Sequence, residues 1–184
     1  MELTKEEKSV LIKIARDSIK NLFDDNELVT PDIEKHPVLN SNCGAFVTLK
    51  INNSLRGCIG YIISDQPLYS TISDAALQSA GNDPRFPKLT RTEFEQVKIE
   101  ISVLSEPFPL KSYDEIILGK HGLILEEGGH RALLLPQVPA EHGMNKDQFL
   151  SALCEKGGFK ADLWKRKKLT LKAFTAIVFD ESDL

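Results

Sequence analysis

The pair Asn52-Asn53 most constrains what this chain can fold into, because it stands between two segments with the pattern of β-strands. Residues 44–51 partly alternate between apolar and polar side chains, and the return segment 55–63 carries two glycines. Asn tolerates a positive φ, so two consecutive Asn residues suit the tight turn of a β-hairpin. The sequence therefore predicts two antiparallel strands joined at this turn.

Helical and extended segments alternate along the rest of the chain. Thr4 and Glu7 have the spacing of a capping box, and apolar residues at helical period predict a helix over about residues 5–23, ended by the polar residues 24–26. The same period predicts a helix over 67–81. Further predicted elements are a strand at 97–104, a short helix opened by 112–115, a hairpin turning at 127–130, a helix capped by Asn145 and ended by 157–158, and a strand-like tail at 169–179. This order indicates an α+β fold with mostly antiparallel pairing.

Length and charge restrict the class of protein. The 184 residues correspond to one domain, long enough to bury a core without disulfides or a metal. The longest apolar runs, 132–135 and 176–179, are far shorter than the roughly 20 residues of a membrane span, and the charged first residues are unlike a signal peptide. The net charge of −4 argues against a general nucleic-acid binder. We therefore expect a soluble, cytoplasmic protein.

The segment 55–60, Leu-Arg-Gly-Cys-Ile-Gly, is the most informative one for function. Glycine inside a strand costs stability, and it usually marks a bulge or a ligand that approaches the backbone closely. Arg56 precedes Cys58 by two residues, so both side chains leave the same face if the strand is regular. A cation there would favour the thiolate, the nucleophilic form of cysteine. The alternative is that Cys58 is a small buried residue, as free cysteines often are.

The loop 82–87 follows the second predicted helix and contains Asp83, Arg85 and two prolines, which exclude regular structure. A rigid loop with these charges could anchor an anion or a carboxylate. The alternative is a turn closed by a local pair between Asp83 and Arg85. Loops often carry function, so both interpretations stay open.

The remaining polar residues give weaker indications. Cys43, Cys58 and Cys154 are read as reduced thiols, and without CxxC, HxH or HxxxH spacings no metal site is expected. His121 is the best general-base candidate, although a lone histidine is more often solvated or satisfied in a core. The basic run 165–168 could touch nucleic acid or an acidic partner, or form a solvated turn.

The segment 55–60 resembles the signature of the AMMECR domain family, whose prokaryotic members are labelled AmmeMemoRadiSam system protein A. Lys88 and Met144 depart from the family pattern, in which a proline and a tryptophan are usual. The resemblance covers nearly the whole chain, which implies a single AMMECR domain over residues 1–184. The other segments that resemble the family are, in order, 44–49, 83–86, 99–104, 119–123, 135–138, 149–150, 156–158 and Trp164.

The resemblance implies more about the fold than about a reaction. It implies a two-lobed α+β domain, in which a larger lobe holds both termini, a smaller lobe is inserted, and a cleft lies between them. It brings no established biochemical activity and no cofactor. It implies that the chain acts with Memo-like and radical-SAM partner proteins in a modification pathway.

Two hypotheses about the site follow. In the first, the chain is an enzyme or a catalytic subunit whose catalytic residues are Cys58, Arg56 and His121. In the second, it is a non-catalytic protein-binding or substrate-presenting module, in which the same segment shapes a recognition groove and Cys58 is dispensable. Neither hypothesis names a substrate, a cofactor or an oligomeric state. The expected binding residues are Leu55, Gly57, Ile59, Gly60, Asp83, Arg85 and Phe86.

Overall fold

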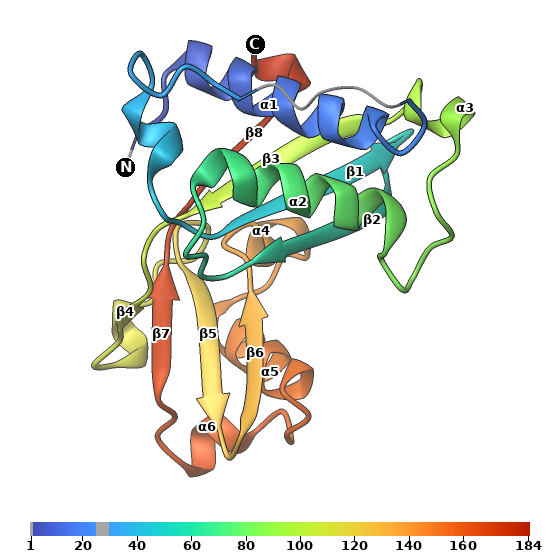
Figure 1. Ribbon diagram of the computed structural model, residues 1–184. Coiled ribbons are helices and arrows are strands. Elements are labelled where there is room, and N and C mark those ends of the chain that lie inside the picture. The colour runs from blue at the N-terminus through green and yellow to red at the C-terminus, as the bar shows by residue number, and fades with distance from the viewer. Residues whose placement is uncertain (1, 25–29) are drawn as a thin grey trace. The chain divides into compact units, whose positions relative to one another are not determined.

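The computed structural model describes residues 2–24 and 30–184 and divides the chain into two compact units. Met1–Leu104 and Ile177–Leu184 form the larger unit, and Ser105–Ala176 form the smaller one (Figure 1). Both units combine helices with an antiparallel sheet. The predicted α+β class is therefore confirmed, together with a larger lobe that holds both termini and a smaller lobe inserted in its sequence.

The larger unit is built on a four-stranded sheet. The turn of its hairpin is made as predicted, because Asn52 and Asn53 have φ angles of 51° and 62°. The strands are β1 (Ala45–Ile51), β2 (Ser54–Tyr61), β3 (Lys98–Leu104) and β8 (Ala176–Asp180), in the spatial order β2-β1-β3-β8. The strand β2 thus lies at an edge of the sheet, and one side of its backbone has no neighbouring strand.

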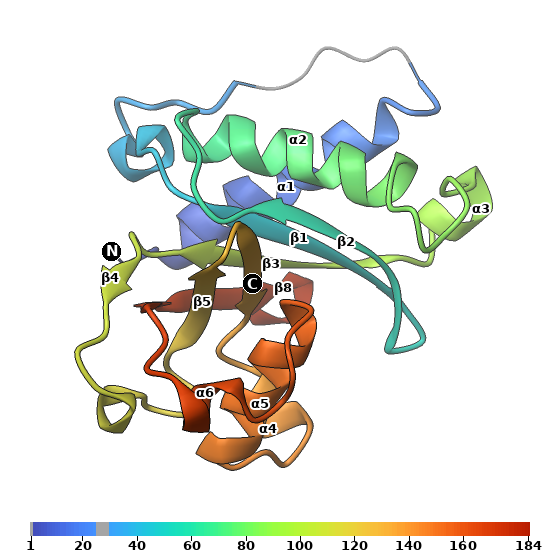
Figure 2. The same cartoon turned by 90° about the horizontal axis from the view of Figure 1, so that it is seen from below.

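Two helices, α1 (Lys5–Lys20) and α2 (Leu68–Gly81), cover one face of this sheet (Figure 2). The predicted capping box starts α1, where Thr4 Oγ1 accepts from the N–H of Glu7 at 3.2 Å. The helix ends earlier than predicted, because the N–H groups of Leu22 and Phe23 bond only three residues back. Residues 25–29, which include most of the predicted break at 24–26, lie outside the described residues. The core between helices and sheet contains Leu11, Ala15, Ile19, Ile72, Ala75, Ala76, Val47, Leu49, Ile99 and Ile101.

Ser79 fastens α2 to the hairpin. Its side chain is 1% exposed, and its hydroxyl accepts a hydrogen bond from the N–H of Ile59 and donates one to the carbonyl of Val47, both at 2.8 Å. A hydroxyl can do both at once because it carries one donor and two acceptor positions. The last turn of α2 is therefore held against both β1 and β2 by one side chain.

Short elements that hydrophobic periodicity does not reveal complete the larger unit. They are a 3-10 helix at Pro37–Asn40, the helix α3 (Arg91–Phe94) and a 3-10 helix at Glu181–Asp183. A single turn is too short to show a period, so only capping residues can mark it in the sequence.

The smaller unit contains a second antiparallel sheet with the order β4-β7-β5-β6. Asn145 caps its longest helix as predicted, in a capping box with Gln148, and Gly128 and Gly129 make the predicted hairpin turn with positive φ. Its core contains Leu123, Leu125, Phe149, Leu150 and Leu153. The elements are β4 (Phe108–Pro109), β5 (Gly122–Glu127), β6 (His130–Leu134), β7 (Leu171–Phe174), α4 (Val138–Glu141), α5 (Lys146–Lys156), α6 (Leu163–Arg166) and a 3-10 helix at Tyr113–Glu115.

The tail predicted as one extended segment at 169–179 is two strands in different sheets, with Thr175 between them. The chain leaves the smaller unit here and returns to the larger one. Thr is itself a good strand former, so the local sequence contains no sign of the change of sheet.

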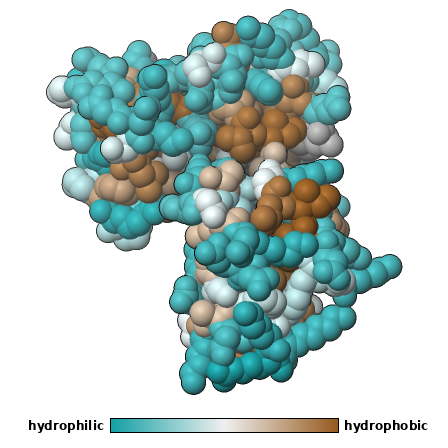
Figure 3. Space-filling view, turned by 180° about the vertical axis from the view of Figure 1, so that it is seen from behind, coloured by the Kyte–Doolittle hydropathy of each residue, from teal (hydrophilic) through white to brown (hydrophobic). Residues whose placement is uncertain are grey.

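The surface seen in Figure 3 is mainly hydrophilic, with separate apolar patches. Ile63, Ile117 and Val178 are among the exposed large apolar residues. Across residues 2–24 and 30–184, no helix has both the length and the apolar character that crossing a membrane requires.

Candidate functional site

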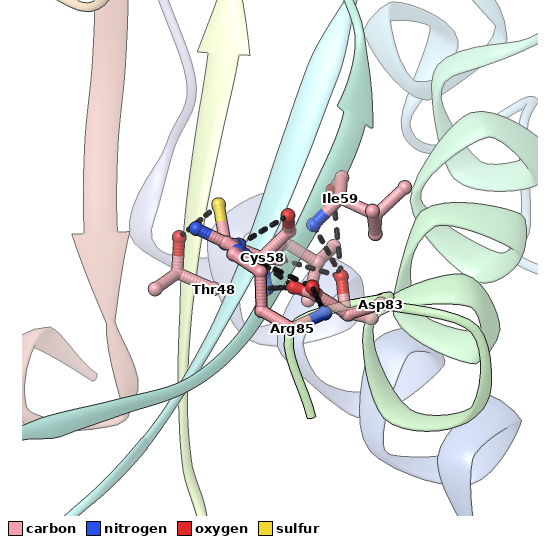
Figure 4. Close-up of polar contacts among 7 residues, drawn as sticks. Thr48, Cys58, Ile59, Asp83 and Arg85 are labelled. Atoms are coloured by element: carbon pink, nitrogen blue, oxygen red, sulfur yellow. Dashed lines mark hydrogen bonds and ion pairs between the residues drawn. The ribbon is translucent and has the colours of Figure 1, made fainter. Parts of the chain in front are cut away.

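Cys58 lies on the edge strand β2, opposite Thr48 of β1. The Cys58 Sγ and Thr48 Oγ1 atoms are 3.2 Å apart and share a hydrogen bond (Figure 4). Cys43 and Cys154 are buried, and burial raises the pKa of both their thiols. Cys58 is only partly buried, so it is the most accessible of the three cysteines.

The loop 82–87 closes the edge of β2 at Cys58. The backbone N–H of Cys58 donates to Asp83 Oδ2 at 2.8 Å, and Arg85 Nη2 donates to the carbonyl of Cys58 at 3.2 Å. A carboxylate thus takes the place of a strand carbonyl, and a guanidinium takes the place of a strand N–H. Figure 4 shows both side chains turned toward the strand. The unpaired edge that β2 would otherwise expose is satisfied at this residue.

The pair between Asp83 and Arg85 that closes the loop is present, as one of the two alternatives predicted. The Asp83 residue is 4% exposed, and its carboxylate accepts from Arg85 Nε at 3.0 Å and Arg85 Nη2 at 2.7 Å. This guanidinium is the main reason that the pKa of Asp83 lies well below its usual range, and the N–H groups of Cys58 and Arg85 lower it further. Asp83 in turn raises the pKa of Arg85. The loop is therefore held by a permanently ionised pair.

Part of the Arg85 guanidinium faces outward. Its side chain is 53% exposed, and Nη1 donates no hydrogen bond to any residue that the structure describes. Nε and Nη2, by contrast, are engaged by Asp83 and by the carbonyl of Cys58. The Nη1 group of Arg85 is thus a cationic donor held in a fixed position on a side chain that is hydrogen-bonded to Cys58. Such a donor suits an anionic group of a ligand.

Arg56 does not lie in a regular stretch of β2. Leu49 pairs with Gly57 and Lys50 pairs with Leu55, so Arg56 is the extra residue of a β-bulge. The prediction that Arg56 and Cys58 share a face assumed a regular strand, and that premise is wrong. A bulge re-aims the side chain that it carries.

The guanidinium of Arg56 binds Glu93, which follows the N-cap of α3. Arg56 Nε and Nη2 donate to the two Glu93 carboxylate oxygens at 2.8 and 3.0 Å, in the bidentate geometry that arginine favours. This pair is the main cause that lowers the pKa of Glu93 to about 2, and the backbone N–H of Thr90 adds to it. The guanidinium carbons of Arg56 and Arg85 also lie 5.8 and 5.5 Å from the centre of the Phe86 ring. The structure therefore brings Arg56, Arg85 and Phe86 together around the loop.

The glycines of the segment make room for neighbouring backbone. A Cβ atom at Gly57 would lie 2.2 Å from the carbonyl oxygen of Ser79 in α2, and one at Gly60 would lie 2.3 Å from the carbonyl oxygen of Ala45 in β1. Both distances are far inside van der Waals contact. The close backbone approach that these glycines predict is thus made by the protein's own helix and strand. Leu55, at the start of β2, is 42% exposed.

His121 belongs to the smaller unit, where it is 8% exposed. Its Nδ1 accepts a hydrogen bond from the N–H of Ile117 at 3.3 Å, and its ring packs edge-on against Phe108. Burial, and then the charge of Lys120, lower the pKa of His121. The ring is therefore neutral near pH 7 with Nδ1 occupied, which fits the alternative of a histidine satisfied within a core. A role as general base stays a prediction.

The structure adds three residues to the site that sequence reasoning did not assign to it: Thr48, Ser79 and Glu93. Glu93 had a signal, because Thr90 precedes it at the spacing of a capping box, and both hydrogen bonds of that box are present. Thr48 and Ser79 had none, since their contacts join segments distant in sequence. Within residues 2–24 and 30–184, no three His, Cys, Asp or Glu side chains are grouped as metal ligands.

Comparisons with known proteins agree over almost the whole chain. The sequence model of the AMMECR1 family matches residues 12–179. A protein of Sulfolobus acidocaldarius is 41% identical over 184 residues, which cover 93% of this chain and 80% of that protein. A protein of Methanocaldococcus jannaschii is 37% identical over 97% of this chain and 92% of its own length. The crystal structure of an uncharacterised protein from Pyrococcus horikoshii superposes with a TM-score of 0.89 at 34% identity, over 98% of this chain and 94% of that one.

The fit of Gly57 against α2 predicts a strong asymmetry between two glycine substitutions. Gly57→Ala forces a methyl group into the Ser79 carbonyl and should lower the free energy of unfolding by about 1–3 kcal/mol. Gly81→Ala, at the end of the same helix, meets nothing closer than 4.0 Å and should be neutral or stabilising by up to about 1 kcal/mol. Urea unfolding of both variants measures the difference. Equal stabilities would show that β2 and α2 do not approach this closely.

The environment of His121 predicts a pH dependence of stability. Because its pKa is lower in the folded protein than in the unfolded chain, the unfolded chain binds the proton more readily. The contribution of the neutral ring is present above the ordinary value of about 6.5 and is lost as the pH falls below it. His121→Asn keeps an acceptor for the Ile117 N–H but cannot titrate, so its free energy of unfolding should fall less between about pH 7 and pH 5. His142→Asn, at an exposed histidine, is the control and should behave like the unmodified protein.

Proposed function

The chain belongs to the AMMECR1 family, and we propose that it is an enzyme or catalytic subunit that uses Cys58 as a nucleophile at the edge of β2. One observation carries the proposal: the residue with the accessible thiol, Cys58, is also bound by the guanidinium of Arg85. The buried carboxylate of Asp83 holds this guanidinium in place. Arg85 donates to the carbonyl of Cys58, and Thr48 shares a hydrogen bond with its sulfur. A partly exposed position beside a cation is typical of reactive cysteines.

The geometry also favours a class of substrate. The outward-facing Nη1 of Arg85 is a donor for a carboxylate or phosphate group next to the reacting carbon. In the proposed step the sulfur of Cys58 forms a bond to an electrophilic carbon, and the leaving group departs with the electron pair of the broken bond. The proton of the thiol passes to solvent. Asp83 takes no part in this step and serves as a positioning residue for Arg85.

We further propose that the chain acts in the cytoplasm with Memo-like and radical-SAM partner proteins, in a pathway that modifies another molecule. The support is the resemblance of the segment 55–60 to the signature of the AMMECR domain family. The catalytic proposal concerns the chain's own residues, so it can be tested without these partners.

A second candidate function has a specific observation in its favour. Gly57, Gly60, Arg56 and Asp83 all hold the shape of β2 through contacts within the protein. These contacts suit a protein-binding or substrate-presenting module, in which the segment forms a recognition surface and the thiol of Cys58 is dispensable.

Two alkylating reagents that differ in charge test the catalytic proposal. Iodoacetate is an anion and iodoacetamide is neutral, and either forms a carbon–sulfur bond with release of iodide. In the native protein at pH 7, Cys58 should be alkylated, whereas Cys43 and Cys154 should react only after unfolding. Arg85→Gln should reduce the ratio of the iodoacetate rate to the iodoacetamide rate about tenfold, because the charge-assisted bond to the anion is lost. Mass spectrometry of the modified peptides follows each cysteine separately.

Arg91→Gln is the matched control, since Arg91 is another exposed arginine of the same unit and pairs with Asp24. It should leave the ratio of rates unchanged. The ratio also corrects for any change in thiolate content, which affects both reagents equally. An inert Cys58 in the native protein at pH 7 would contradict the nucleophile, and a ratio insensitive to Arg85 would contradict the anionic substrate.

Replacement of the thiol separates the two candidate functions. Cys58→Ala removes the sulfur and leaves the backbone contacts to Asp83 and Arg85 in place. In a host whose own copy of the gene is deleted, the catalytic proposal predicts that this variant, folded and expressed at the normal level, fails to restore function. Full complementation would reject cysteine catalysis and support the binding module. Cys43→Ala is the control for loss of a thiol elsewhere.

A further inference from the structure

A pocket of about 240 Å³ lies within the smaller unit, beside the 3-10 helix at Tyr113–Glu115. Leu169 and Leu171 line it and are 4% and 2% exposed, so they belong to the apolar core of that unit. Leu110 and Tyr113 contribute further apolar wall. Its interior is therefore suited to an apolar group.

The walls of this pocket are fixed by hydrogen bonds. The N–H of Leu169 donates to the Tyr113 hydroxyl at 2.8 Å, and the N–H of Leu110 donates to the carbonyl of Leu171 at 3.0 Å. The Tyr113 ring also packs edge-on against Trp164, with 5.9 Å between the ring centres. A site whose walls are already ordered loses little conformational entropy when a ligand binds.

Two lysines, Lys111 and Lys168, contribute to the lining of the pocket. The lysines near Lys168 in sequence are neutralised: Lys167 pairs with Glu127 at 2.7 Å and Lys172 pairs with Glu126 at 3.0 Å. Within the part of the chain that the structure describes, neither Lys111 nor Lys168 forms an ion pair. The pocket thus combines an apolar interior with two such lysines, and the Glu115 carboxylate accepts a hydrogen bond from the backbone N–H of Lys111 at 3.0 Å.

We propose that this pocket binds a small carboxylate with an apolar body, such as a medium-chain fatty acid. The apolar part occupies the space beside Leu169, Leu171 and Tyr113, and the carboxylate meets the ammonium groups of Lys111 and Lys168. The volume equals that of about eight waters at roughly 30 Å³ each, which accommodates a short alkyl chain but not a nucleotide cofactor. The site is separate from Cys58 in the sequence and does not depend on the function proposed for it.

The single tryptophan of the chain is a built-in reporter for this site. Because Trp164 contacts Tyr113, titration with octanoate should change its fluorescence in a saturable way. Octanamide has the same chain length without the charge, and it should bind at least about fivefold more weakly if the two exposed ammonium groups contribute roughly 1 kcal/mol together. All measurements stay below the critical micelle concentration of octanoate. The same titrations followed by amide NMR should shift the signals of residues 110–113 and 168–171.

Lysine variants locate the charge contribution. Lys111→Met and Lys168→Met keep the alkyl stems and should each weaken octanoate binding while leaving octanamide binding unchanged. Lys160→Met, at another exposed lysine of the same unit, is the matched control and should have no effect. The proposal is overturned if octanoate perturbs neither Trp164 nor these amide signals, if octanoate and octanamide bind equally well, or if Lys160→Met weakens binding as much as the pocket variants do.

Discussion

The buried carboxylate of Asp83 is the interaction on which the site at β2 depends. A carboxylate that is 4% exposed is tolerable only when it is paired and fully hydrogen-bonded, and Arg85 together with the N–H of Cys58 meets that requirement. The same bonds satisfy the free edge of β2 and fix the loop 82–87 to it. The buried charge of Asp83 therefore has three effects. It satisfies the N–H of Cys58 at the edge of β2, it fixes the loop 82–87 to that edge, and it orients the guanidinium of Arg85 beside Cys58.

The segment 55–60 is largely occupied with structure, and this changes how its residues are interpreted. Gly57 and Gly60 leave room for the backbone of α2 and β1. Arg56 lies in a bulge and binds Glu93. An unusual sequence therefore does not by itself mark a catalytic centre. Of the polar side chains described at this site, the thiol of Cys58 and the outer face of Arg85 are left for a ligand, and the proposed function uses just these two.

Local chemistry made much of the fold predictable from the sequence. Asn52-Asn53, the capping boxes at Thr4 and Asn145, and the apolar period of α2 each act over a few residues, and the structure contains all of them. What the sequence could not supply depends on distant partners. The bulge at Arg56 and its pair with Glu93 are examples, because Glu93 is 37 residues away. The division of the tail at Thr175 is another, since both halves have the pattern of a strand.

The roles of Asp83 and Cys58 differ in a way that bears on how function can be separated from stability. Asp83 holds the loop through its own hydrogen bonds, so removing it leaves Arg85 and the edge N–H of Cys58 without their partner and disturbs fold and site together. The Cys58 side chain, by contrast, has one hydrogen bond, to Thr48, and lies partly exposed. Its loss leaves the backbone contacts of β2 intact. The framework and the thiol of the proposed function therefore reside on different residues, and substitution of Cys58 can test that proposal with little disturbance of the fold.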